Sequence, residues 1–104
     1  MSFSYGWEKL HSAVHSLCGA NSQSERLINA ASFSLLNIKA ERHLPEELRV
    51  NFTTLMSDLT SKKASGDEGT IRATINSFNE SELNGAIESI ISLYDSVCRH
   101  QEPN

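Results

Sequence analysis

Hydrophobic residues recur along most of this chain at intervals of three and four, the spacing that places side chains on one face of an α-helix. The first such stretch covers residues 4–17, and its apolar stripe consists of Trp7, Leu10, Val14 and Leu17. Gly19 follows this stripe closely. Because glycine adopts the left-handed conformation without a Cβ clash, we expect Gly19 to end the first helix in that conformation.

A second helix is predicted to begin at a capping box in residues 22–25. There the Ser22 hydroxyl accepts from the N–H three residues later, and the Glu25 side chain reaches back. The apolar face that follows is broad and consists of Leu27, Ile28, Ala31, Leu35 and Ile38. Phe33 and Leu36 lie off the centre of this face, which predicts a helix that is buried on more than one side. We therefore expect this segment to be the central helix.

A third helix is predicted to start at Pro45. Proline fits the first helical turn, and Glu46 and Glu47 favour the positive end of the helix dipole. Its stripe consists of Leu48, Phe52, Leu55 and Leu59, with Met56 beside it. The pattern then breaks, and residues 61–69 are expected to form an exposed loop.

The fourth segment, residues 67–77, is short, and its pattern is ambiguous. Residues 70–75 could alternate as a strand, but the chain offers no convincing partner strand, and a lone strand is unstable. The spacing of Ile71, Ile75 and Phe78 suits a short helix, which is our prediction.

A last helix is predicted from Asn79, which forms a second capping signature with Glu82. Its main stripe consists of Leu83, Ile87, Ile90, Tyr94 and Val97. Gly85 lies in the interior of this helix. There it either permits a close helix crossing or is simply tolerated, at a cost of about 1 kcal/mol relative to alanine. Residues 100–104 are expected to form a frayed tail.

Together these segments predict an all-α fold, a compact bundle of four to five short helices in one domain over residues 1–104. The composition agrees, because 38% of the residues are hydrophobic and 21% are charged, which is a globular balance. Only two prolines and five glycines occur, which favours helices over a β-sandwich with many turns.

Charge is distributed unevenly and bears on the choice of partners. Residues 1–63 carry seven Lys or Arg and six Asp or Glu, whereas residues 64–104 carry two and seven. The acidic part repels a nucleic-acid backbone, so no nucleic-acid partner is expected, whereas a basic protein partner is compatible. The first residues lack a signal-peptide pattern, and no apolar run approaches the roughly 20 residues of a membrane span. We therefore expect a cytoplasmic protein without a membrane partner.

Side chains that can bind a metal are concentrated in the first helix, where Glu8, His11, His15 and Cys18 follow one another at helical spacing along one edge of the apolar face. Glu8 and Cys18 are separated by about 15 Å along the helix axis, whereas zinc holds its ligand atoms within about 2.3 Å. At most two neighbouring residues of this helix can therefore share one ion.

A closed metal site would need ligands from elsewhere, for which the candidates are Glu25, Cys98, His100 or another subunit. Without such a ligand, His11, His15 and Cys18 are boundary residues that cover the edge of a core, and we expect no metal and no other cofactor. A Cys18–His pair specifies no orienting third group, and no G-x-S-x-G elbow occurs. We therefore predict no catalytic residues and no enzymatic activity.

Four short blocks can be considered together: WEKLH at 7–11, PEELR at 45–49, DEGTI at 67–71 and SLYD at 92–95. With these blocks in this order the chain resembles a group of small uncharacterised bacterial all-helical proteins. The resemblance would span nearly the whole chain, and it implies a bacterial, single-domain protein without implying an activity.

The functional prediction is a non-catalytic protein-interaction or accessory module of a bacterial cell. Self-association as a homodimer is included, because apolar stripes on so many helices leave a face to be covered. One alternative is a small metal-binding protein that uses His11, His15 and Cys18. The other is a small acidic regulator that binds a basic protein partner.

Overall fold

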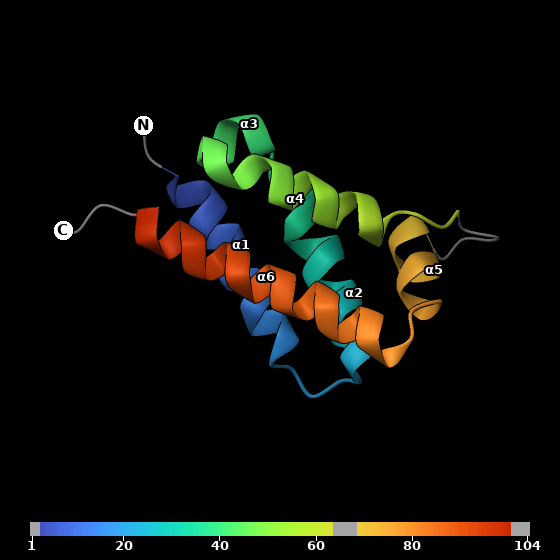
Figure 1. The fold of residues 1–104 in the computed structure, drawn as a ribbon. Helices are drawn as coiled ribbons and strands as arrows, with labels where there is room; N and C mark the ends of the chain where they lie inside the picture. The colour runs from blue at the N-terminus through green and yellow to red at the C-terminus, as the bar shows by residue number, and fades with distance from the viewer. Residues whose placement is uncertain (1–2, 64–68, 101–104) are drawn as a thin grey trace.

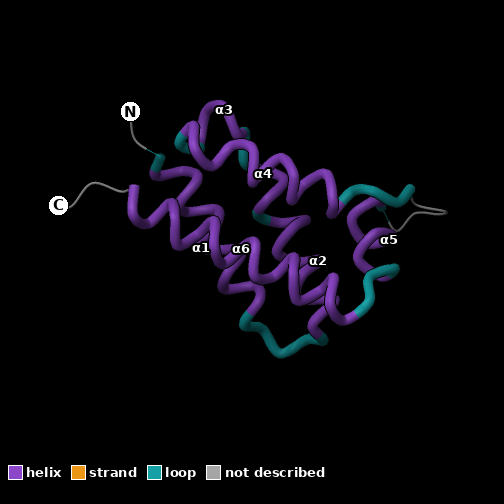
Figure 2. The backbone as a smooth tube through the Cα atoms, in the orientation of Figure 1, coloured by secondary structure: helices purple, strands orange, loops and turns teal. Residues whose placement is uncertain are grey.

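A computed structural model describes residues 3–63 and 69–100 of the protein. Figures 1 and 2 show an arrangement of helices joined by loops, and the described residues contain no strand. The helices are α1 Ser4–Leu17, α2 Gln23–Phe33, α3 Ala40–His43, α4 Glu46–Leu59, α5 Thr70–Asn76 and α6 Glu80–His100, with a 3-10 turn at Leu35–Asn37. The prediction of an all-α bundle is confirmed.

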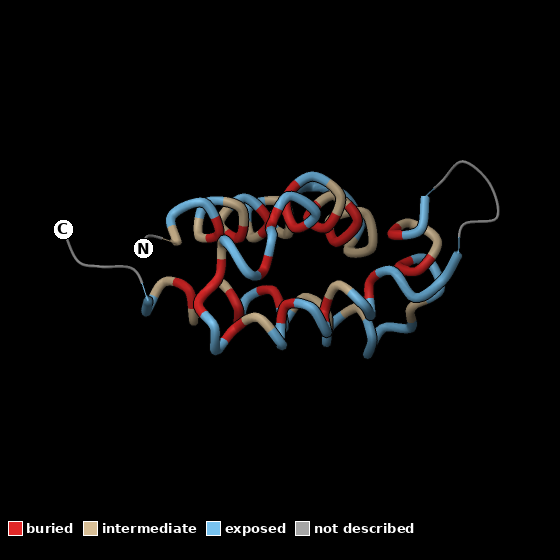
Figure 3. Tube along the Cα trace, turned by 90° about the horizontal axis from the view of Figure 1, so that it is seen from above, coloured by how far each residue is buried: buried red, intermediate tan, exposed pale blue. Residues whose placement is uncertain are grey.

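The longest helix, α6, contacts α1, α4 and α2, and α2 in turn packs against α1 and α5. In Figure 1, α4 and α6 lie in front of α1 and α2, while α5 lies at the end of the molecule away from the N and C labels. Buried positions face the interior between the helices, as Figure 3 shows. The side chains with no exposed surface include Leu10, Leu27, Leu35, Leu44, Leu59, Ile90 and Val97. No helix in the described parts of the chain is long and apolar enough to cross a membrane.

The second predicted segment differs most from the structure. The α-helix ends at Phe33, the backbone leaves helical geometry at Ser34, and the chain continues through the 3-10 turn. Phe33 and Leu36 are 72% and 50% exposed, so the expectation of burial on more than one side is wrong for these two residues. The Asn37 side-chain amide donates to the Phe33 carbonyl at 3.1 Å, which satisfies a carbonyl at the end of α2.

Both predicted helix starts with capping residues are present. The Ser22 hydroxyl accepts the Glu25 N–H at 3.3 Å, but the Glu25 carboxylate, instead of reaching back, takes two hydrogen bonds from Arg72. The box at the start of α6 is reciprocal. The Asn79 side chain accepts the Glu82 N–H at 2.8 Å, and the Glu82 carboxylate accepts the Asn79 N–H at 2.9 Å. The start of α6 is therefore capped by local interactions.

The glycines have different roles from those expected. Gly19 follows the end of α1 without a left-handed conformation, because its N–H simply donates to the Ser16 carbonyl in a tightened last turn. Gly85 has nothing within 4 Å of the position that a β-carbon would occupy, so it is tolerated and does not serve a helix crossing. The close approach occurs at Gly6, which is buried in α1 against the carbonyl of His43.

Residues 70–75 are helical, as predicted, and α5 is held by a buried hydroxyl. Thr74 has no exposed surface, and its oxygen accepts the Lys62 N–H at 2.9 Å and lies 2.8 Å from the Thr70 carbonyl. Residues 61–63 are exposed, in agreement with the expected loop, while its positions 64–68 lie outside the described residues. His100 belongs to α6, so the expectation that it begins a frayed tail is wrong; residues 101–104 lie outside the described residues.

Candidate functional site

His11 lies on the edge of α1 that faces α6, and the exposed His15 lies one turn further along the same helix. The His11 ring is stacked on the Trp7 ring with centroids 4.8 Å apart, and the His15 ring is inclined to the His11 ring by 61° with centroids 4.5 Å apart. The Nδ1 atom of His11 lies 3.1 Å from the Tyr94 hydroxyl and forms a hydrogen bond with it. His11 is therefore part of the packing between α1 and α6, and one of its two nitrogens has a protein partner.

The other metal candidates do not join these two histidines. Cys18 is exposed at the end of α1, and Glu8 is exposed on the same helix. Across residues 3–63 and 69–100, no three His, Cys, Asp or Glu side chains lie close enough together to hold a metal ion. The candidate ligands from outside α1 have other partners or positions. Glu25 pairs with Arg72, Cys98 accepts a hydrogen bond from Trp7, and His100 is exposed at the end of α6.

A small polar network at this seam joins the first and last helices. The Trp7 indole N–H donates to the Cys98 sulfur at 3.3 Å, and the Tyr94 ring lies 6.4 Å from the Trp7 ring. The pKa of Tyr94 is raised above 10, first by its hydrogen bond with Cys98, then by burial and by the charge of the thiolate form, while the Trp7 N–H acts in the opposite direction. Tyr94 and Cys98 are thus positioned by packing between helices.

A largely apolar surface lies beside the C-terminal half of α2. A hollow of about 440 Å³ lies between α2, the following turn and α5, and we call it the α2–α5 groove. Its lining residues are Ile28, Asn29, Ser32, Phe33, Leu36, Thr60, Gly69, Thr70, Ile71 and Arg72. Phe33 and Leu36 project at its rim, while Ile28 and Ile71 are buried beneath it. This surface combines exposed and buried apolar side chains.

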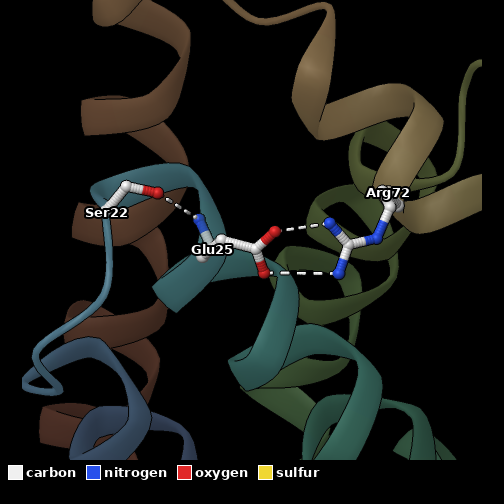
Figure 4. A network of polar contacts seen from close by, with 3 residues as sticks. All are labelled: Ser22, Glu25 and Arg72. Carbon is white, nitrogen blue, oxygen red and sulfur yellow. Dashed lines mark hydrogen bonds and ion pairs between the residues drawn. The ribbon is translucent and has the colours of Figure 1, made fainter.

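The charged group at the edge of this groove is neutralised by a partner. Arg72 donates from both terminal nitrogens to the two oxygens of Glu25, as Figure 4 shows, and thereby connects α5 to the first turn of α2. The hydrogen bond from Arg72 is the main cause that lowers the pKa of Glu25 from its usual value; burial opposes this shift, and the positive charge of Arg72 adds to it. The same pair raises the pKa of Arg72. The groove therefore has no unbalanced charge among its described lining residues.

A second hollow surface, between α4 and α6, has the opposite electrostatic character. Two adjoining hollows of about 410 and 490 Å³ share Leu55, Asp58, Gly85 and Ser89, and together we call them the α4–α6 groove. The walls carry the carboxylates of Asp58, Glu82 and Glu88, and the described lining residues include no Lys, Arg or His. The groove therefore presents negative charge over a floor of small and apolar side chains.

Phe33 and Leu36, whose off-stripe positions predicted burial, are instead exposed. Phe33 and Leu36 departed from the apolar stripe, and that departure was the available signal of exposure. The Glu25–Arg72 pair joins residues 47 positions apart, so no local pattern indicates it. Comparison with family models, curated proteins and solved structures finds no match. The resemblance to small bacterial proteins stays a prediction.

Proposed function

We propose that this protein is a non-catalytic protein-interaction module that binds a partner protein through the α2–α5 groove. The exposure of Phe33 is the observation that carries the proposal. Its side chain is 72% exposed although the same helix buries Leu27, Ala30 and Ala31 completely. Large aromatic side chains contribute most to affinity when a partner covers them, and they are enriched at protein interfaces.

The surroundings of Phe33 support a binding surface. Leu36 is half-exposed beside it, and the groove adds the edges of Ile28 and Ile71, so the apolar atoms form one patch. The Glu25–Arg72 pair and Asn29 supply polar atoms at the border. An apolar centre with a polar rim is the usual composition of a protein interface.

The test places a photo-crosslinking phenylalanine analogue, p-benzoylphenylalanine, at position 33 of the full chain in growing cells. A matched control carries it at Val50, which is also 72% exposed but lies on α4 outside the groove. We expect a discrete protein adduct from position 33 and none from position 50. The absence of a specific adduct at position 33 would refute the proposal, whatever the identity of the partner.

A stability measurement tests whether Phe33 instead supports the fold of the monomer. Because most of the Phe33 side chain already contacts water, Phe33→Ser should change the free energy of unfolding of the monomer by less than about 1 kcal/mol. Thermal melting of the monomer followed by circular dichroism checks this. A loss of several kcal/mol would show that Phe33 supports the fold, and the interaction proposal would lose its basis.

The α4–α6 groove favours a second candidate, an acidic regulator that binds a basic protein segment. Asp58, Glu82 and Glu88 line the groove without a described cation among them, and Ser89 and Gly85 leave room for an incoming chain. Attraction between such a groove and a basic segment is long-ranged and is screened by salt. Binding of a Lys- and Arg-rich helical peptide should therefore weaken with added salt and with Glu88→Gln. Affinity that is independent of salt would refute this candidate.

A further inference from the structure

The α2–α5 groove contains both a projecting side chain and a hollow in a single patch. Phe33 protrudes at the rim with 72% of its surface exposed, and the hollow of about 440 Å³ lies directly beside it. In a two-fold symmetric dimer the same patch occurs on both subunits, so each projecting group meets the hollow of the other. A patch with both features side by side has the shape that such an interface requires.

Electrostatics distinguishes this patch from the other groove of the molecule. A two-fold axis places each surface against its own copy, so any unbalanced charge faces a like charge. In the α2–α5 groove, Asn29 and Thr70 are uncharged and the charge of Arg72 is balanced by Glu25. The α4–α6 groove, with Asp58 and Glu88, would repel its own copy. Of the two surfaces, the α2–α5 groove is the one suited to self-association.

The polar residues of the rim fit the same arrangement. The side chains of Asn29 and Ser32 can both donate and accept hydrogen bonds, so each can pair with an identical residue on a second copy. An interface of ordinary size buries about 800 Å² on each partner, whereas Phe33 and Leu36 offer only a small apolar centre. A patch of this size fits a reversible dimer.

We infer that the partner in the α2–α5 groove is a second copy of this chain, with Phe33 of each subunit inserted beside Ile28 and Ile71 of the other. This inference rests on the proposed function, because it names the partner for the same surface. The two Phe33 rings lie close to the two-fold axis, and Leu36 covers the edge of the interface. Dissociation constants in the micromolar range are expected.

Sedimentation of the purified full chain from about 1 to 300 μM tests the inference, since this range brackets a micromolar dissociation constant. We expect the average mass of the unmodified protein to rise toward that of a dimer. Phe33→Ser should weaken association by at least about a hundredfold, because two buried rings are removed together, each equivalent to about tenfold or more. Val50→Ser, which removes an equally exposed side chain away from the groove, should behave like the unmodified protein.

A charge exchange at Asn29 separates this interface from any other contact between copies. Asn29→Asp and Asn29→Lys should each be monomeric alone, because like charges would meet across the axis, whereas an equimolar mixture should form heterodimers. Circular dichroism shows whether each variant is folded. If an Asn29 variant does not fold, Phe33→Ser alone tests the interface.

The outcomes separate the two proposals. A strict monomer up to 300 μM, or a dimer that Phe33→Ser leaves intact, overturns the self-association inference. If the purified chain is monomeric while a cross-linker at position 33 captures a different protein, the interaction proposal stands and only its partner was misassigned. If neither dimer nor adduct forms, both proposals are overturned.

Discussion

The contact between Gly6 of α1 and the α3 turn makes a sharp prediction about stability. A β-carbon on Gly6 would lie 2.2 Å from the His43 carbonyl oxygen and 3.2 Å from a methyl group of Leu44, whereas ordinary contacts begin at 3.4 Å. Gly6→Ala therefore requires α1 and α3 to separate by about 1.2 Å at this point. The obstacle is backbone, so no side-chain rotation can relieve it.

The α3 turn is held firmly, which makes this separation costly. The Arg49 guanidinium donates to the carbonyls of Ala40 and Leu44 at 3.2 and 3.1 Å, and the His43 ring accepts the Lys39 N–H at 2.8 Å. Inserting a methyl group into such a contact costs about 1–3 kcal/mol or somewhat more. Alanine recovers up to about 1 kcal/mol of helix propensity, so we expect a net loss of about 2 kcal/mol.

Thermal unfolding at one fixed protein concentration measures this effect. The expected loss corresponds to a decrease in Tm of about 8–16 °C for a domain of this size. Gly85→Ala is the matched control, because it makes the same substitution at an exposed helical position with nothing within 4 Å. It should raise Tm by about 4–8 °C through helix propensity. If both variants were stabilised equally, the assigned close approach of α1 to α3 would be wrong.

Three further predictions concern polar groups. Tyr94 is the only tyrosine in a Tyr5→Phe variant, and its tyrosinate absorbance should show ionisation above pH 10. The part of the folding stability that depends on neutral Tyr94 should be lost as the pH rises through that raised pKa. Ionisation at or below pH 10 would contradict the contact with Cys98. Because the pKa of Glu25 is lowered from 4.5, the Glu25–Arg72 ion pair should contribute to folding stability above that pH. The difference in urea midpoint between the unmodified protein and Arg72→Met should shrink as pH falls below 4.5, and a constant difference would count against it. Thr74→Val removes the buried hydroxyl that accepts the Lys62 N–H, so the unfolding free energy measured in urea should fall by about 1 kcal/mol, and an unchanged value would refute the role of the hydroxyl.

The helices that were predicted well are those with an uninterrupted apolar stripe, and two of them also have a local start signal. Residues 4–17, the helix after Pro45 and the helix after Asn79 correspond to α1, α4 and α6, because periodicity and capping depend on neighbours within a few positions. The break at Ser34 has no Gly or Pro to announce it, so the stripe was extended across a point where the backbone turns. Tertiary packing determines the backbone of this region, because Leu35 and Ile38 are buried although the chain there forms a 3-10 turn and not an α-helix.

The candidate surfaces were harder to predict than the helices. The position of Phe33 outside its stripe was visible in the sequence, but whether an off-stripe aromatic residue meets a second helix or water depends on elements far along the chain. Pairing of Glu25 with Arg72 has the same dependence. The histidines of the first helix illustrate both a local contact that was predictable and a distant contact that was not. Their spacing predicted proximity of His11 and His15, while the partner of His11, Tyr94, comes from the last helix.

The seam between α1 and α6 also has a consequence for how the chain acquires its structure during synthesis. Trp7 and its hydrogen-bond acceptor Cys98 are 91 positions apart, and ribosomes add about 5–20 residues per second. About 5–18 s therefore pass between the synthesis of Trp7 and the synthesis of Cys98. In that interval α1 can pack on α2, but the edge that carries Trp7 and His11 is exposed to other proteins of the cell. Translation speed, as well as thermodynamic stability, thus sets how long this aromatic edge stays uncovered.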